Sequence, residues 1–275
     1  MKTLSTSAGR RLLPLAVVLA LPSVATAQSA KEILMTSLEK YEQRMEGIEN
    51  YTTVQETMGF ETELTFVRTK DDEGRTVFVP KGREDASSGG MSNFYRMYPK
   101  IAERAELEGT ESVDGEQCHV LAISDFSGLD LDEQMEMGDR GDFVPKTGLL
   151  YVDTDDHLIR KMELGGEITR DGQTSPMTAV TVLSDYREVE GMLHPFQLHI
   201  TATGLAAGMS EEEMEEARRG LAEMEKNLEG MDATQRAMVE RMMGGQMEKL
   251  RKMLESGQFE ITVVTKEVRV NEAIQ

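Results

Sequence analysis

Residues 148–162 read G-L-L-Y-V-D-T-D-D-H-L-I-R-K-M, and this stretch decides the fold class. Two apolar runs rich in β-forming residues, Gly148–Val152 and Leu158–Leu164, flank the segment Asp153–Asp156, which is typical of a tight turn. The stretch therefore predicts two antiparallel strands joined by a hairpin. Turn signals of the same kind recur at Val113–Glu116, Arg170–Gln173 and Glu190–Gly191.

Alternating apolar and polar residues extend the same pattern in both directions along the chain. They predict further strands at residues 51–58, 62–68, 76–79, 101–107, 117–123, 178–183, 186–189, 193–202 and 259–270. Short turns between successive strands favour an antiparallel meander over a parallel sheet, because parallel strands need long crossover connections.

Helical spacing appears in two places. Before the first strand, residues 30–45 carry apolar side chains three and four positions apart, and Gly47 ends this helix. The second place is an insertion at about residues 205–257, where Ser210 with Glu213 predicts the start of one helix and Asp232 with Gln235 the start of another. The insertion is therefore expected to form a helical hairpin.

We expect an α+β fold in which one apolar face of the antiparallel sheet is covered by helices. The N-terminal helix and the inserted hairpin are the two helical elements that the sequence offers for that role. Residues 28–275 are expected to form one domain that carries the hairpin as an insertion.

The N-terminus has the pattern of an export signal. Basic residues precede an apolar run, Leu12–Leu21, and the small residues Ala25-Thr26-Ala27 follow it. Residues 1–27 are therefore predicted to be a signal peptide that is cleaved before Gln28, which places the mature chain in the periplasm. The apolar run is too short for a permanent transmembrane anchor, which needs about 20 residues.

Charge and cysteine content narrow the classes of partner. The formal net charge is −20, and it becomes −23 when the three basic residues of the signal peptide are removed. Nucleic acids and anionic membranes are polyanions, so neither is an expected partner. The single cysteine, Cys118, excludes an internal disulfide.

Residues with catalytic or metal-binding chemistry are sparse. Four histidines occur, and none belongs to a metal-binding or catalytic motif. His194 and His199 are five apart on a predicted strand, which places them on opposite faces. We therefore expect no enzymatic activity, no cofactor and no metal site built on these residues.

Methionines are concentrated in the insertion, with six between Glu229 and Gly257. Methionine is flexible and polarizable, so a row of methionines can adapt to irregular partners. Three roles are compatible with the spacing. The row can pack the two helices on each other or on the sheet, line a groove or cavity for an acyl chain or an apolar segment of another protein, or bind Cu(I) through its thioethers.

Three stretches carry a resemblance to a known family. Residues 148–162, residues 185–196 (D-Y-R-E-V-E-G-M-L-H-P-F) and residues 259–274 resemble the C-terminal half of bacterial outer-membrane lipoprotein-sorting proteins, a superfamily similar to the periplasmic lipoprotein carriers. The resemblance implies a strongly curved antiparallel sheet that forms an incomplete barrel around helices. It also implies an apolar interior that takes lipid acyl chains.

These observations lead to one functional hypothesis and one rival. We expect a non-enzymatic periplasmic protein that binds a lipid or lipoprotein acyl chain between the sheet and the helices. The rival is an interaction or sensor module that docks an envelope protein through the hairpin. The expected ligand-binding residues are Leu221, Met224, Leu228, Met238, Met242, Met243, Met247 and Leu250 of the hairpin, and Leu198 and Ile200 of the sheet.

Overall fold

The computed structural model describes residues 28–71, 74–82, 94–95, 97–129, 142–170, 172–204 and 211–273. The expected signal peptide and Ser210 lie outside these residues. Four helices occur in the described ranges: α1 (Ala30–Arg44), α3 (Tyr98–Ala102), α4 (Glu211–Glu229) and α5 (Ala233–Ser256). The strands are β1 (Asn50–Thr57), β2 (Phe60–Lys70), β3 (Thr76–Pro80), β4 (Ala105–Val113), β5 (Glu116–Ile123), β6 (Asp142–Asp153), β7 (Ile159–Arg170), β8 (Gln173–Val189), β9 (Met192–Thr203) and β10 (Gln258–Val270).

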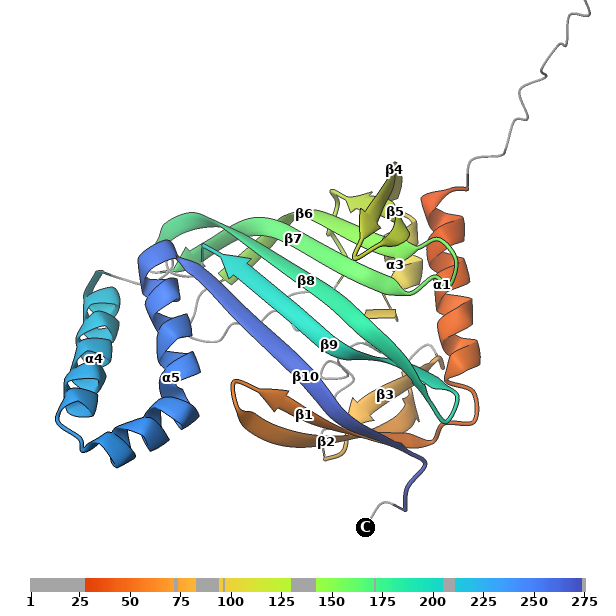
Figure 1. Ribbon diagram of the computed structural model, residues 1–275. Helices are drawn as coiled ribbons and strands as arrows, with labels where there is room; N and C mark the ends of the chain where they lie inside the picture. Colours follow the sequence, from red (N-terminus) through yellow and green to blue (C-terminus); the bar gives the residue numbers. More distant parts are fainter. Residues whose placement is uncertain are drawn as a thin grey trace, which may run out of the picture.

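All ten strands form one sheet with the order β3-β2-β1-β10-β9-β8-β7-β6-β5-β4. Every pair of neighbours is antiparallel. The two ends of this order, β3 and β4, are not paired with each other, so the sheet is open (Figure 1). The expected α+β class with a large, unclosed antiparallel sheet is confirmed.

The tight turns follow from residues that tolerate a positive φ. Asp114 and Gly115 join β4 to β5 with φ angles of 52° and 94°, as two-residue hairpin turns require. In the turn after β6, the Asp153 carboxylate accepts hydrogen bonds from the backbone N–H groups of Asp155 and Asp156. Arg160 forms ion pairs with Asp153 and Asp156, which fixes this turn from the side of β7.

Helix α1 is packed against the sheet at one end of the molecule. Its first turn is stabilised by a capping box between Ser29 and Glu32. Ile33 and Leu34 are fully buried and belong to the main hydrophobic core, which includes Leu150 of β6. The helix therefore supplies apolar side chains to the core and does not merely lie beside it.

Polar contacts also bind α1 to the turn between β6 and β7. The Ser37 hydroxyl donates a hydrogen bond of 2.7 Å to the carbonyl of His157, and both groups are buried. Lys40 and Arg44 donate to the carbonyls of Asp155 and Asp156 at 2.9 and 2.6 Å. These side chains satisfy backbone carbonyls that the turn leaves unpaired.

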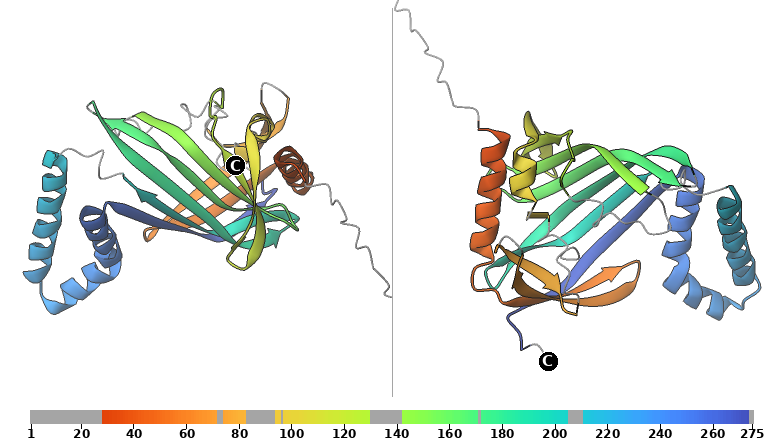
Figure 2. Two further views of the ribbon diagram at one scale, coloured as in Figure 1. Left: turned by 90° about the horizontal axis from the view of Figure 1, so that it is seen from above. Right: turned by 180° about the vertical axis from the view of Figure 1, so that it is seen from behind.

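The hairpin formed by α4 and α5 projects beyond the end of the sheet that is distant from α1 (Figures 1 and 2). Asp232 caps α5 by accepting from the N–H groups of Thr234 and Gln235, and Gly257 ends it in a left-handed conformation. The buried residues of the hairpin, Leu221, Met247 and Leu254, form a cluster of their own.

Two strand predictions are wrong in detail. The strand expected at residues 101–107 is preceded and partly replaced by α3, which begins with Pro99 in its first turn, and β4 starts only at Ala105. Proline is favoured at that position because its fixed φ suits a helix start. The two strands expected at 178–183 and 186–189 are one strand, β8, although Asp185 between them has a φ of 53°.

Candidate functional site

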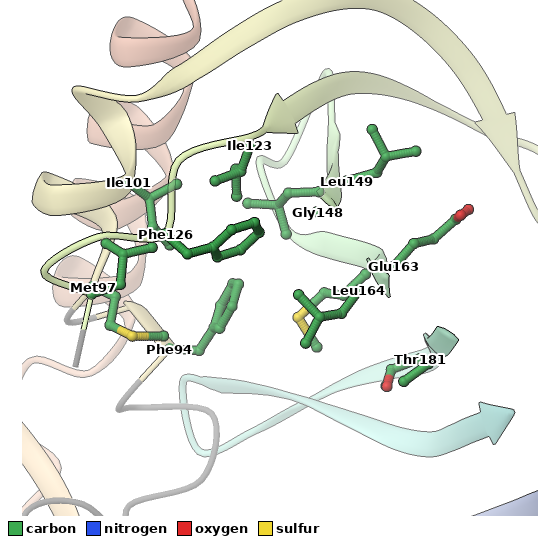
Figure 3. Close-up of a pocket in the computed structure, with 14 residues that line it drawn as sticks. Phe94, Met97, Ile101, Ile123, Phe126, Gly148, Leu149, Glu163, Leu164 and Thr181 are labelled. Atoms are coloured by element: carbon green, nitrogen blue, oxygen red, sulfur yellow. The ribbon is translucent and has the colours of Figure 1, made fainter. Parts of the chain in front are cut away.

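The described residues enclose an apolar cavity of about 330 Å³ between the sheet and the segments that precede β4 and follow β5. Figure 3 draws the residues around it as sticks and labels ten of them. The residues that line it are Phe94, Met97, Ile101, Ile123, Phe126, Leu129, Gly148, Leu149, Leu150, Met162, Glu163, Leu164, Ala179 and Thr181.

Strand register builds the sheet wall of the cavity. Residues directly opposite each other on neighbouring strands point to the same face. Gly148 is opposite Ile123 on one side and Leu164 on the other, and Leu164 is in turn opposite Ala179. A second row is formed by Leu150, Met162 and Thr181. The wall therefore consists of two adjacent rows of mainly apolar side chains across four strands.

Helical residues before β4 and the segment after β5 supply the opposite wall. Phe94 packs edge-on against Tyr98 of α3, with ring centroids 5.7 Å apart, and both residues belong to the main core. Ile101 and Leu129 are almost completely buried, with exposed fractions of 2% each. This wall is thus attached to the core that also holds α1.

The lining contains a single charged side chain, Glu163, and its carboxylate is engaged elsewhere. The Tyr151 hydroxyl donates to Glu163 Oε1 at 3.0 Å, and Lys161 pairs with the same carboxylate. Burial and the neighbouring Glu163 raise the pKa of Tyr151, so this hydroxyl stays protonated and remains a donor. In Figure 3 the carboxylate points away from the cavity, which leaves the Thr181 hydroxyl as the polar group at its margin.

The two sheet residues predicted from the sequence lie on the same face as the cavity. Ile200 is opposite the lining residue Thr181, and Leu198 is opposite Leu183. Leu198 also packs against the main core. Neither residue lines the cavity as described, but both lie on β9, next to the strand that carries its margin.

The hairpin residues predicted from the sequence lie apart from the cavity. Leu221 and Met247 are buried within the hairpin, and Leu228 packs against them. Met224 and Met238 are exposed, with exposed fractions of 41% and 63%. The side chains of Met242, Met243 and Leu250 lie outside the described residues. The lining described above includes none of these eight residues.

Sequence reasoning did not identify the cavity. Phe94, Phe126 and Leu129 lie outside the strands, where no periodic pattern marks an inward-facing side chain. One signal was present in Gly148, because an isolated glycine inside a strand often marks a close approach by another group.

Three histidines and the single cysteine have the surroundings of structural residues and not of reactive ones. Burial lowers the pKa of His119, His157 and His194, and burial raises the pKa of the Cys118 thiol to about 11, so the thiolate is disfavoured. Within the described ranges, no three His, Cys, Asp or Glu side chains are grouped closely enough to hold a metal ion. Among the helices described, none has an apolar stretch long enough to cross a bilayer.

No family model and no curated protein sequence matches the chain. Its structure is similar to an outer membrane lipoprotein-sorting protein domain from Vibrio parahaemolyticus, with a TM-score of 0.40 and 9% identity over 88% of this chain and 95% of that one. A DUF1329 family protein from Desulfovibrio piger gives a TM-score of 0.37 and 9% identity over 88% and 95%. A LolA superfamily protein from Nitrosomonas europaea gives 0.35 and 12% over 88% and 94%.

Two of these structures carry the names of the lipoprotein-sorting and carrier proteins that the sequence resembles. Identity and TM-scores are low, so the functional proposal below depends on the residues of this chain.

Proposed function

We propose that this chain is a non-enzymatic lipid-binding protein of the bacterial periplasm, which holds one acyl chain in the cavity between the sheet and α3. The observation that carries the proposal is the cavity itself, whose lining combines apolar side chains from four strands with Phe94 and Phe126 from the opposite wall. Ligand pockets are lined in this way when burial of apolar surface supplies most of the binding free energy.

The volume and the charge of the site indicate which lipid it takes. A volume of about 330 Å³ is near the lower end of the roughly 300–1,000 Å³ typical of ligand pockets, which suits one chain better than several. The Glu163 carboxylate is turned away and the formal net charge is −20. A lipid with an uncharged head group therefore suits the site better than a fatty acid anion.

Leu198 and Ile200 extend the proposed binding surface onto β9, because the register places them on the face of the sheet that bears the cavity. The proposal includes export directed by residues 1–27 and cleavage before Gln28. It also includes the hairpin as a cover for the apolar face of the sheet, and the contribution of the hairpin to lipid binding is tested separately below.

A displacement assay tests the proposal. The mature chain would be loaded with N-phenyl-1-naphthylamine, an uncharged apolar dye, and titrated with a monoacylglycerol and with the fatty acid of the same chain length. We expect both to displace the dye, with the monoacylglycerol binding more tightly. Native mass spectrometry of protein purified from its own envelope would show whether a lipid, copper or neither is bound.

A matched pair of variants locates the binding site. Leu164→Gln introduces an amide into the cavity wall without hydrogen-bond partners there, so we expect dye affinity to fall about ten-fold or more. Val144→Gln is the control, because Val144 is an exposed residue of β6. Equal affinities of the two variants would show that the dye binds elsewhere, and a wild-type chain that binds neither dye nor lipid would exclude lipid binding.

The exposed methionines of the hairpin favour a second candidate function, the docking of an envelope protein. Met224 and Met238 present apolar, adaptable side chains to solvent. Replacing both by glutamine would weaken such docking while leaving dye binding unchanged. If the same double variant loses dye binding, the hairpin belongs to the lipid site, as the sequence first suggested for the eight hairpin residues.

A further inference from the structure

Phe126 lies against a position of β6 that has no side chain. A Cβ atom built on Gly148 would be 3.0 Å from Cζ and 3.4 Å from Cε1 of the Phe126 ring, and 3.6 Å from Cβ of Ile123. A contact of 3.0 Å is tighter than most Cβ contacts in proteins, so any side chain at residue 148 would require the ring to shift by at least a few tenths of an ångström.

The backbone that carries Phe126 is fixed on both sides. Asp125 accepts hydrogen bonds from the N–H and the hydroxyl of Ser127, at 2.9 and 2.6 Å. Arg104 pairs with Asp125 at 3.5 Å and donates to the carbonyl of Lys100 in α3 at 2.8 Å. The N–H of Leu129, which is buried, donates to the Phe126 carbonyl at 3.2 Å. The ring is therefore a firmly supported part of the wall.

The ring projects toward Gly148 and Leu164, across the rows of side chains that form the sheet wall (Figure 3). An acyl chain that lies along those rows from the Thr181 side meets the ring at Gly148. The chain cannot continue past this point unless the ring moves.

We propose that Phe126, seated on Gly148, limits the length of the acyl chain that the cavity accepts. This inference depends on the proposed function and specifies its ligand as a single-chain lipid of bounded length. While a longer chain still enters, each buried methylene should tighten binding about four-fold, which corresponds to about 0.8 kcal/mol. Beyond the ring, further methylenes stay in water and add no affinity.

The test uses the mature full chain and monoacylglycerols of increasing length, from octanoyl to stearoyl, in competition with N-phenyl-1-naphthylamine. For the wild-type chain we expect affinity to rise with length and then level off. Phe126→Ala should move this plateau to longer chains, with a gain of about four-fold for each methylene newly buried. Gly148→Val should push the ring into the cavity and move the plateau to shorter chains.

Phe60→Ala provides the matched control, because it removes the same ring from an exposed position with an exposed fraction of 67%. We expect its plateau to coincide with that of the wild-type chain. Phe126→Leu, together with thermal unfolding of every variant, covers the case in which the alanine variant fails to fold. Leucine fills less of the wall than phenylalanine, so it should give a smaller shift in the same direction.

The outcomes separate this inference from the proposed function. If the wild-type chain and Phe126→Ala or Phe126→Leu bind with the same length dependence, Phe126 does not limit chain length, although lipid binding stands. If the wild-type chain binds neither the dye nor any monoacylglycerol, both the proposed function and the inference are wrong.

Discussion

Helix α1 and the hairpin α4–α5 have similar sequence patterns, yet they are held in different ways. Both show apolar residues at helical spacing and a capped N-terminus. Ile33 and Leu34 of α1 are fully buried in the core of the sheet, and Ser37 is hydrogen-bonded to a distant turn. The buried residues of the hairpin contact mainly one another.

This difference in packing shows that amphipathic spacing predicts a helix but does not predict which element the helix packs against. Most of the stability of a helix in a protein comes from the tertiary packing of its apolar face. At the α1 end that packing is shared with the sheet and the cavity, whereas the hairpin relies on a small core of its own. The four predictions below test whether the two regions differ as much in stability as in packing.

The largest expected effect is the difference in unfolding free energy between two leucine-to-alanine variants, one in α1 and one in the hairpin. Leu34→Ala should lower the free energy of global unfolding by about 2–5 kcal/mol, because a fully buried side chain leaves a cavity in the shared core. Leu221→Ala should lower it much less, since the hairpin can unfold locally while the sheet persists. Urea denaturation followed by circular dichroism measures both, and equal losses would contradict the distinction.

The next largest effect is a pH dependence of the free energy of unfolding, which we expect from His194 near the α1 end. Burial lowers the pKa of His194 to about 4, and its Nε2 has no hydrogen-bond partner among the described residues. Its unfolded-state pKa is about 6.5, so the unfolded chain binds the proton more tightly. The neutral, buried His194 therefore contributes about 3 kcal/mol to the free energy of unfolding. This contribution is fully present above pH ~6.5 and is lost as the pH falls toward about 4.

His194→Phe should remove this part of the pH dependence while keeping a planar ring near Tyr51 and Phe196. The free energy of unfolding would be measured for both proteins across that pH range. If the two curves stay parallel, burial of His194 is not their source.

A smaller effect is expected from the hydrogen bond that fastens α1 to the β6–β7 turn. Ser37→Ala leaves the buried carbonyl of His157 without its partner, which should cost about 1–3 kcal/mol of unfolding free energy. Ser256→Ala is the control in the hairpin, where the Ser256 hydroxyl donates to the exposed carbonyl of Lys252. Thermal unfolding should show a clear loss for the first variant and almost none for the second.

The smallest effect on global stability has the opposite sign. Gly244 and Gly245 lie inside α5, and apart from the backbone of the helix itself no atom of the described residues lies within 4 Å of a Cβ built on either. Replacing both by alanine should stabilise the hairpin by about 1 kcal/mol per residue. Hydrogen exchange at the amides of α5 should slow, whereas the midpoint of global unfolding stays nearly constant. A large rise in that midpoint would mean that the hairpin and the sheet unfold together.

Local sequence chemistry predicted most elements of the fold. The helix at 30–45, the helical hairpin and the turns at Asp114-Gly115 and Glu190-Gly191 each depend on spacing and capping within a few residues. The helix found in place of a strand at the start of residues 101–107 also depends on local chemistry, because Pro99 favours the first turn of a helix. The short turns account for the pairing within β1–β3 and within β4–β9, which are runs of consecutive strands. The expected meander does not continue from β3 to β4, which lie at opposite ends of the sheet, because β10 joins the two runs by pairing with β1 and β9.

The candidate site was far less predictable. The sequence directed attention to the methionines of the hairpin, which are conspicuous in composition, whereas the cavity depends on Phe94 and Phe126, which lie outside the strands. Their positions are set by contacts such as Arg104 with Asp125 and Phe126 with Gly148, which no periodicity encodes. Leu198 and Ile200 lie on the face of the sheet that bears the cavity, and their contact with a ligand stays a prediction.

The position of β10 has a consequence for folding. This last strand lies between β1 and β9, and Asn271 just after it accepts a hydrogen bond from the N–H of Glu49, 222 residues earlier. Because such distant pairing must wait for a large loop to close, the sheet cannot be completed until the C-terminal segment is available. Until β10 is available, β1 and β9 lack their common neighbour, and the sheet therefore stays incomplete.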